Sequence, residues 1–242
     1  MIKDQLTREQ TIDKIRVLRG IVTARWFLIL GLTVLGIFLR SLSNHEFLLG
    51  LDFVRIFALS GIAGTLNVAY YLYLRREEKV TNRGISVVSF LQISIDTILY
   101  SSIIFFSGGI TATSYLFYTY AIYNAAALYK IRGVLLTVFF CVLIYTGIIG
   151  LEFFEITPHV QQYAPRFAPN HFQNYAYTFV VYITIIFSLV IAGAFSSVVS
   201  EIVESREQQI KREKDRVSSI IEHLPNGIIL IDNYHQITFA NK

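Results

Sequence analysis

Long apolar runs separated by short polar segments dominate the chain. A helix needs about 20 mostly apolar residues to cross the hydrocarbon layer of a bilayer, which is roughly 30 Å thick. The pattern predicts six transmembrane helices: Trp26–Leu39 extended by its flanks, Ile56–Leu74, Ile85–Phe106, Thr111–Tyr129, Val134–Leu151 and Tyr177–Val199. The fourth stretch is rich in threonine and tyrosine, so a re-entrant segment is the alternative there.

The basic residues follow the same alternation. If the N-terminus is cytoplasmic, all of the 21 lysines and arginines lie on the inner side except Arg40, Arg55 and Arg166. Cytoplasmic segments carry an excess of lysine and arginine, whereas outer segments do not. The distribution therefore predicts six helices with both termini in the cytoplasm.

Composition excludes several other classes of protein. Hydrophobic residues make up 54% of the chain and charged residues only 16%, against about 25% charged in an average soluble domain. A disordered tail, a coiled-coil rod and a nucleic-acid-binding arm are excluded. The single cysteine, Cys141, excludes an intramolecular disulfide and a cysteine-based metal cluster. We expect an all-α membrane protein that does not bind nucleic acid.

Residues 1–21 precede the first apolar run. Thr7 and Gln10 form a capping box, and Ile12, Ile15 and Leu18 follow at helical spacing. With its lysines and arginines, this segment is predicted to be a cytoplasmic basic amphipathic helix on the anionic inner leaflet. A solvated cytoplasmic helix is the alternative. The six-helix membrane domain then covers residues 22–199.

Asp96 is the most informative single residue. It lies near the middle of the third apolar stretch, where an aspartate costs roughly 2.5–3.5 kcal/mol on insertion scales. A buried polar cluster is expected around it, with further side chains from the second, third and fourth stretches: Gln92, Asn67, Asn124, Tyr118 and Tyr123. Such a cluster is typical of a ligand pocket, an ion or proton site, or a two-state switch. The alternative is hydrogen bonding that only holds helices together.

The outer loops differ in length. Ser107-Gly108-Gly109 joins the third and fourth stretches with almost no slack, which predicts a tight hairpin and places Gly108 and Gly109 in the sensing region. The segment 152–176 is long and rich in proline and aromatic residues. A metal or pH-sensitive site is one interpretation of its polar side chains, and interfacial polar residues are the other: Glu152, Glu155, His159 and His171.

The sixth apolar stretch leads into a charged segment, residues 200–222, without glycine or proline. The helix is therefore expected to continue out of the membrane. Val203, Ile210, Val217 and Leu224 recur every seven residues, which predicts one seam of a dimeric coiled coil. A single solvated helix is the alternative.

Residues 223–242 change pattern again. Pro225 is expected to end the helix, and two β-rich runs within "LPNGIILID" and "ITFANK" predict a β-hairpin. This hairpin resembles the opening of a PAS domain. Because a two-stranded hairpin is marginally stable alone, we expect the natural protein to continue. His223 is interpreted as a linker residue rather than a phosphorylated histidine, because a strand follows it at once.

The chain as a whole resembles the PilS-type sensor histidine kinases, which join a six-helix membrane sensor to PAS and kinase modules. The resemblance lies in Arg25, in Gln92 and Asp96, and in the stretches 106–109, 118–127 and 132–133. It departs from the family pattern after the Gly-Gly turn, where Thr111–Ser114 replaces the usual Ser-Pro. The resemblance implies a homodimer in the bacterial inner membrane, a partner response regulator, and ATP and Mg²⁺ in a later kinase module. A pilin within the membrane is a possible ligand.

Two other functions remain open. One keeps the sensor and changes its output to a diguanylate cyclase or another PAS-coupled module. The other is a small transporter that uses Asp96 as a proton or ion site. The 242 residues contain no glycine-rich nucleotide loop, no Ser/His/Asp set and no metal-ligand cluster. No residue is therefore predicted to be catalytic, no cofactor is expected in this part, and any kinase activity lies beyond Lys242.

Overall fold

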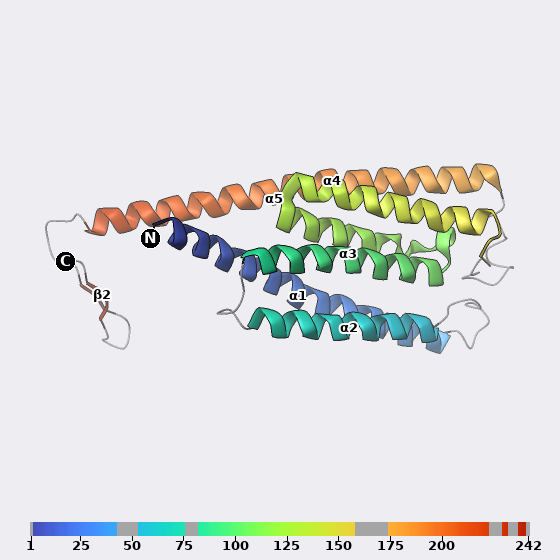
Figure 1. Cartoon of the computed structure of the whole chain (residues 1–242), viewed down its shortest axis with the longest axis horizontal. Coiled ribbons are helices and arrows are strands. Elements are labelled where there is room, and N and C mark those ends of the chain that lie inside the picture. Colours follow the sequence, from blue (N-terminus) through green and yellow to red (C-terminus); the bar gives the residue numbers. More distant parts are fainter. Residues whose placement is uncertain are drawn as a thin grey trace. The chain divides into compact units, whose positions relative to one another are not determined.

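The computed structural model describes residues 2–42, 53–75, 82–157, 174–222, 229–231 and 237–240. Side chains lie outside the description at residues 2–13, 35, 39, 40, 42, 53, 56, 82, 83 and 222 and in both strands. The chain divides into two units, residues 1–197 and 198–242. The first contains α1 (Ile2–Leu42), α2 (Phe53–Arg75), α3 (Asn82–Phe106), α4 (Phe117–Phe153) and the first part of α5 (Tyr175–Glu222) (Figure 1). The rest of α5, β1 (Ile229–Ile231) and β2 (Ile237–Ala240) belong to the second.

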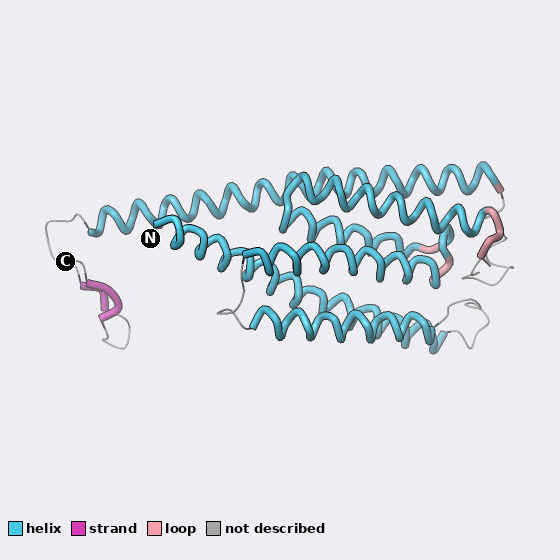
Figure 2. Tube along the Cα trace, in the orientation of Figure 1, coloured by secondary structure: helices cyan, strands magenta, loops and turns pink. Residues whose placement is uncertain are grey.

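Helix is by far the commonest conformation of the described chain (Figure 2). Five helical stretches are long and apolar enough to cross a membrane: Lys14–Phe38, Phe57–Arg75, Gly84–Phe106, Thr113–Phe153 and Tyr175–Ile221. The prediction of an α-helical chain with several membrane-length helices is therefore confirmed. Stretches expected to be separate, the fourth and the fifth, here form one element, α4.

α4 is a hairpin of two helical legs rather than one straight rod. Lys130 has φ 56° and ψ −150°, which no helix can contain. The Ile110 amide donates a 3.2 Å hydrogen bond to Glu152 Oε2, although a straight helix would carry Glu152 about 50 Å from the start of α4. Figure 1 shows the two legs running in opposite directions. The predicted stretches Thr111–Tyr129 and Val134–Leu151 correspond to these legs.

The first leg of α4 runs alongside α3 from one end to the other. Its beginning follows the Gly-Gly turn at the end of α3, and at its far end the Tyr129 hydroxyl donates a 2.9 Å hydrogen bond to the Ser86 carbonyl in the first turns of α3. Two 3₁₀ turns, η3 (Gly109–Thr111) and η4 (Thr113–Leu116), begin this leg. Because a 3₁₀ helix rises about 2 Å per residue, these turns lengthen the leg.

The turn between α3 and α4 requires glycine. Gly108 has φ 121° and Gly109 has φ 52°, a region that glycine adopts without strain. A Cβ on Gly109 would also lie 1.8 Å from Glu152 Oε1. The α3–α4 connection is thus a tight turn, as predicted, and the end of α4 closes over it.

Two apolar clusters hold the first unit together. The larger joins α3, both legs of α4 and α5, through side chains such as Ile104, Ile122, Tyr145 and Leu189. The smaller joins α1, α2 and α3: Ile15, Leu18, Val22, Leu74 and Ile85. The predicted apolar face of the N-terminal segment therefore packs, at Ile15 and Leu18, against protein. The capping box predicted at Thr7 and Gln10 is wrong, because α1 begins at Ile2 and both residues lie inside it. Arg19 also donates a 2.9 Å hydrogen bond to the Leu74 carbonyl, where a positive charge suits the C-terminus of α2.

The second unit contains the exposed part of α5 and the β-hairpin. Val203, Ile210 and Val217 are all exposed in the single chain, and Leu224 lies outside the described residues, as do His223 and Pro225. β1 and β2 pair antiparallel, with Ile229 opposite Ala240 and Leu230 opposite Phe239. The two predicted strands are present as an antiparallel pair, and the segment that joins them lies outside the described residues. Their membership of a PAS domain and the coiled coil remain predictions.

Candidate functional site

A buried ion pair joins α1 to α3. The guanidinium of Arg25 donates a hydrogen bond to the carboxylate of Asp96, and the two residues are only 2% and 3% exposed. Arg25 lies near the middle of the stretch Lys14–Phe38, and Asp96 near the middle of Gly84–Phe106. Removing two charges from water costs several kcal/mol each, which their attraction and added hydrogen bonds must offset. The pair is therefore an unusual feature of a membrane bundle.

Tyrosines surround this ion pair. The guanidinium carbon of Arg25 lies 5.4 Å from the centre of the Tyr70 ring, within the range of a cation–π contact. Tyr100 and Tyr120 also lie within electrostatic range of both charges, and their rings meet edge to face at 6.3 Å. Phe117 stacks on Tyr100 at 5.8 Å. These rings, from α2, α3 and α4, enclose the pair.

Three helices hold two successive turns of α1. The side-chain amide of Asn67, in α2, donates a 3.0 Å hydrogen bond to the carbonyl of Val22. The Tyr120 hydroxyl, in α4, donates a 3.2 Å hydrogen bond to the neighbouring carbonyl of Ile21. Asp96 of α3 holds Arg25 one turn further along. A displacement of any of these helices therefore changes the environment of Arg25.

Much of the hydrogen-bonding capacity around the pair is unused. Both amide atoms of Gln92, one turn before Asp96, are buried without a hydrogen-bond partner among the described residues. The same holds for three further atoms: Arg25 Nε, Asn67 Oδ1 and Tyr70 Oη. A buried polar group without a partner costs about 1–3 kcal/mol. A second arrangement that gave these atoms hydrogen-bond partners would remove this cost, which favours an exchange of partners within the cluster.

Most of the residues predicted to form the buried polar cluster are buried in the structure. Asp96, Gln92, Asn67 and Asn124 are all buried. The Tyr118 hydroxyl is buried too, but it hydrogen bonds to Ser101 at 2.7 Å instead. Tyr123 is 52% exposed, so the expectation that its hydroxyl joins a buried cluster is wrong. It lies on the outward face of α4, one position from the buried Asn124.

Arg25 is the residue that sequence reasoning missed as the partner of Asp96. It was counted among the basic residues of the inner side, because it precedes the apolar run that begins at Trp26. A signal was available in the spacing. Leu18, Val22, Arg25 and Ile29 are separated by four, three and four residues, and all four are buried. A basic residue in register with an apolar helix face therefore belongs to the interior.

Gly108 and Gly109, expected in the sensing region, directly follow the C-terminal end of α3. They form the turn that Glu152 covers, and Glu152 is itself buried. The possible metal site in segment 152–176 gains no support from Glu152, which faces this turn. No cluster of three or more potential ligands occurs among the described residues, and His159 and His171 lie outside them.

The site can couple the conformations of four helices. Two opposite charges enclosed by aromatic rings lie where these helices meet, and several side chains around them have unused hydrogen-bonding capacity. Each helix in the cluster contributes at least one hydrogen bond or ion-pair partner. No family model, no curated protein and no solved structure matches the chain.

Proposed function

We propose that the chain is the membrane sensor region of a dimeric two-component sensor histidine kinase, of the PilS type, in the bacterial inner membrane. Six crossings with both termini in the cytoplasm are part of this proposal. The observation that carries it is α5, a single 48-residue helix that is apolar at its start and highly charged at its end. A β-hairpin follows it along the chain.

The unbroken helix supports a role in transmission. Leu189 of α5 belongs to the apolar cluster, and a Cβ on Gly193 would lie 3.0 Å from Val138, so α5 packs closely on α4. No glycine or proline interrupts residues 200–222. A rotation or shift imposed on the apolar part is therefore carried along the helix axis. The exposed Val203, Ile210 and Val217 supply the seam through which two copies pair.

The geometry of α4 supports the six-crossing topology over a re-entrant fourth segment. One end of its first leg follows the turn at the end of α3, and Tyr129 at the other end bonds to Ser86 near the start of α3. This leg therefore covers nearly the same depth as α3, a helix of membrane length. A re-entrant segment would stop part of the way. Lys130 and Arg132 then lie at the cytoplasmic surface, as the positive-inside rule requires.

The Arg25–Asp96 pair is the proposed switch. A signal shifts a conformational equilibrium only if it favours one state over the other. The side-chain atoms of Gln92 and Asn67 that have no partner among the described residues provide hydrogen bonds that a second state can form. The input would be a molecule that reaches the membrane helices, and a membrane-embedded protein such as a pilin fits this requirement. The partner response regulator, ATP and Mg²⁺ act through domains beyond Lys242.

Two alternative functions remain. The first differs only in its output, and the second agrees with less of the structure. A diguanylate cyclase or another PAS-coupled output would use the same helices, and only the following domain differs. A transporter needs Asp96 to bind and release a proton or an ion. The carboxylate is instead held by the buried guanidinium of Arg25, which neutralises it in place.

The experiment is an autophosphorylation assay on the full-length protein in lipid bilayers, with labelled ATP and Mg²⁺. We expect an acid-labile, base-stable phosphoryl group, the signature of phosphohistidine. A protein that takes no label but converts GTP into a cyclic dinucleotide would support the cyclase alternative. A proton flux into liposomes that Asp96→Asn abolishes would support the transporter.

A further inference from the structure

A groove lies between α3 and α4, lined by residues from Phe90 to Ile98 of α3 and from Tyr129 to Ile144 of α4. It has a volume of about 810 Å³, within the range of small-molecule sites. Most of its lining is apolar, with Phe90, Ile93, Leu136, Phe140 and Leu143 among the contributing side chains. At one end it is lined by Tyr129 and Arg132, next to the break between the legs of α4.

A second, smaller pocket adjoins the groove at its basic end. It has a volume of about 130 Å³ and is lined by Lys14 of α1, Ser86 and Ser89 of α3, and Tyr129. Tyr129 lines both spaces. Lys14 and Arg132 are both exposed, and each lines one of the two spaces that share Tyr129. Two positive charges and several hydroxyl groups therefore lie at the mouth of an apolar channel.

The length of the groove indicates its occupant. From Arg132 to Ile144 the second leg of α4 rises about 18 Å. This is close to half of the roughly 30 Å hydrocarbon layer, so the groove matches the acyl chain of one leaflet. A transmembrane helix of a second protein would need a surface that runs the whole depth. Basic residues at headgroup level, next to an apolar channel, select a lipid with a negative headgroup.

We propose that this groove binds an anionic phospholipid of the inner leaflet. Its acyl chain lies between α3 and the second leg of α4, and its phosphate interacts with Arg132 and Lys14. The occupant touches Thr97, which is one residue from Asp96, and Ile93, which is one residue from Gln92. The lipid therefore adjoins the helix that carries the ion pair. This inference needs the membrane topology proposed above and does not depend on the kinase output.

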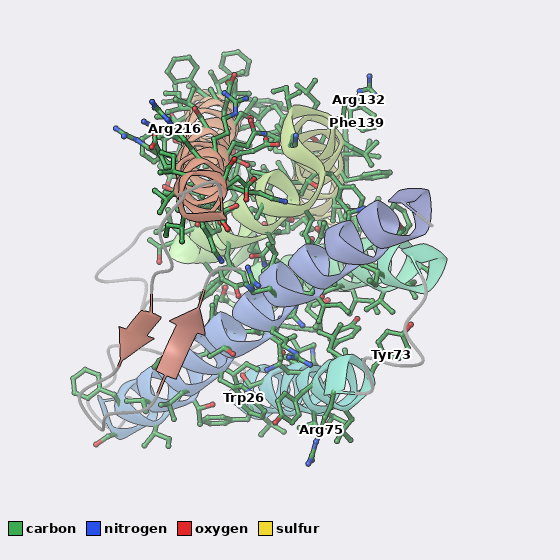
Figure 3. The ribbon with its side chains drawn as sticks, turned by 90° about the vertical axis from the view of Figure 1, so that its left-hand side faces the viewer. Trp26, Tyr73, Arg75, Arg132, Phe139 and Arg216 are labelled. Carbon is green, nitrogen blue, oxygen red and sulfur yellow. The ribbon has the colours of Figure 1, made fainter. Side chains whose placement is uncertain are left out.

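The test uses the full-length protein in detergent and native mass spectrometry, with phosphatidylglycerol and phosphatidylcholine of identical acyl chains as probes. We expect phosphatidylglycerol to be retained preferentially. Arg132→Gln should lower that preference about fivefold, and Lys14→Gln with Arg132→Gln about 25-fold, the effect of one and two surface charges. Arg75→Gln is the matched control. Arg75 is exposed at the same end of the bundle but points away on the opposite side from Arg132 (Figure 3).

A second pair of variants tests the apolar channel. Leu136 lines the groove, whereas its neighbour Leu135 is exposed elsewhere on α4. Leu136→Trp should fill the groove and reduce retention of both lipids, and Leu135→Trp should not. Equal retention of the two lipids by the wild type, or an equal loss in Arg75→Gln, would overturn the proposal. So would a Leu136→Trp variant that dissociates the dimer and keeps its lipid, because the groove would then be a subunit interface. Phosphorylation is read separately, so its absence leaves this outcome intact.

Discussion

Arg25 of α1 and Asp96 of α3 form an ion pair that is buried near the middle of two helices long and apolar enough to cross a membrane. Hydrogen bonds from Asn67 and Tyr120 fix the preceding turn of α1. Four helices therefore meet at one charged pair. A small relative movement of any of them must be accommodated there, which makes the pair suited to couple an input in the membrane to α5.

The first prediction concerns the cost of breaking this pair. Arg25→Met and Asp96→Leu should each lower the free energy of unfolding by about 3–5 kcal/mol, because each leaves a buried charge without its partner. The double variant should be about as stable as the wild type or more so, since no charge is then buried. Denaturant titration in micelles measures both.

The matched control for the pair is Arg55→Met. Arg55 lies 4.9 Å from the Phe106 ring in an exposed cation–π contact, and its loss should cost about 1 kcal/mol or less. A double variant of Arg25 and Asp96 that is as unstable as either single variant would show that the two charges do not act as a pair.

The second prediction contrasts two buried amides. Gln92→Leu removes two polar atoms that have no partner among the described residues, so it should leave stability unchanged or raise it by about 1 kcal/mol. Asn67→Leu removes the hydrogen bond to Val22 and should lower stability by about 0.6–1 kcal/mol. The two variants are compared in the same unfolding assay. A larger loss in Gln92→Leu than in Asn67→Leu would mean that Gln92 is satisfied in the native protein.

The third prediction concerns the turn after α3. Gly109→Ala should destabilise the protein by about 2 kcal/mol or more, because of both the positive φ and the 1.8 Å contact with Glu152. Adding Glu152→Ala should recover only the part that comes from the contact. Gly147→Ala is the control, since a Cβ there meets open space and alanine favours a helix by up to about 1 kcal/mol. Equal effects of Gly109→Ala and Gly147→Ala would contradict this structure of the turn.

The fourth prediction concerns pairing of two copies along α5. In a Cys141→Ala background, single cysteines at Val203, Ile210 and Val217 should form crosslinked dimers in membranes under mild oxidation. A cysteine at Gln209 should crosslink several-fold less, because it lies beside the seam rather than on it. Equal crosslinking at Ile210 and Gln209 would favour the single solvated helix.

Hydrophobic pattern and charge alone predicted much of this fold, including several long apolar helices, the tight turn at Gly108 and Gly109, and the paired strands Ile229–Ile231 and Ile237–Ala240. Burial of Asp96 and Gln92 was also predictable, because a polar residue within an apolar membrane helix faces the interior of the bundle rather than lipid. The partner was not. Arg25 lies 71 positions from Asp96, and the local sequence pattern does not indicate which helix packs against α3. Glu152 was missed for the same reason, since its role depends on the return of α4 to the turn at Gly109.

The most direct test of the account compares autophosphorylation rates of full-length protein in bilayers, between the wild type and the double variant Arg25→Met with Asp96→Leu. The double variant should be folded and dimeric, so a change in rate reports coupling rather than unfolding. We predict that its rate differs from that of the wild type by about fivefold or more, the range of ordinary coupling energies. A stable, dimeric double variant that is phosphorylated at the wild-type rate would contradict the claim that this ion pair is the switch.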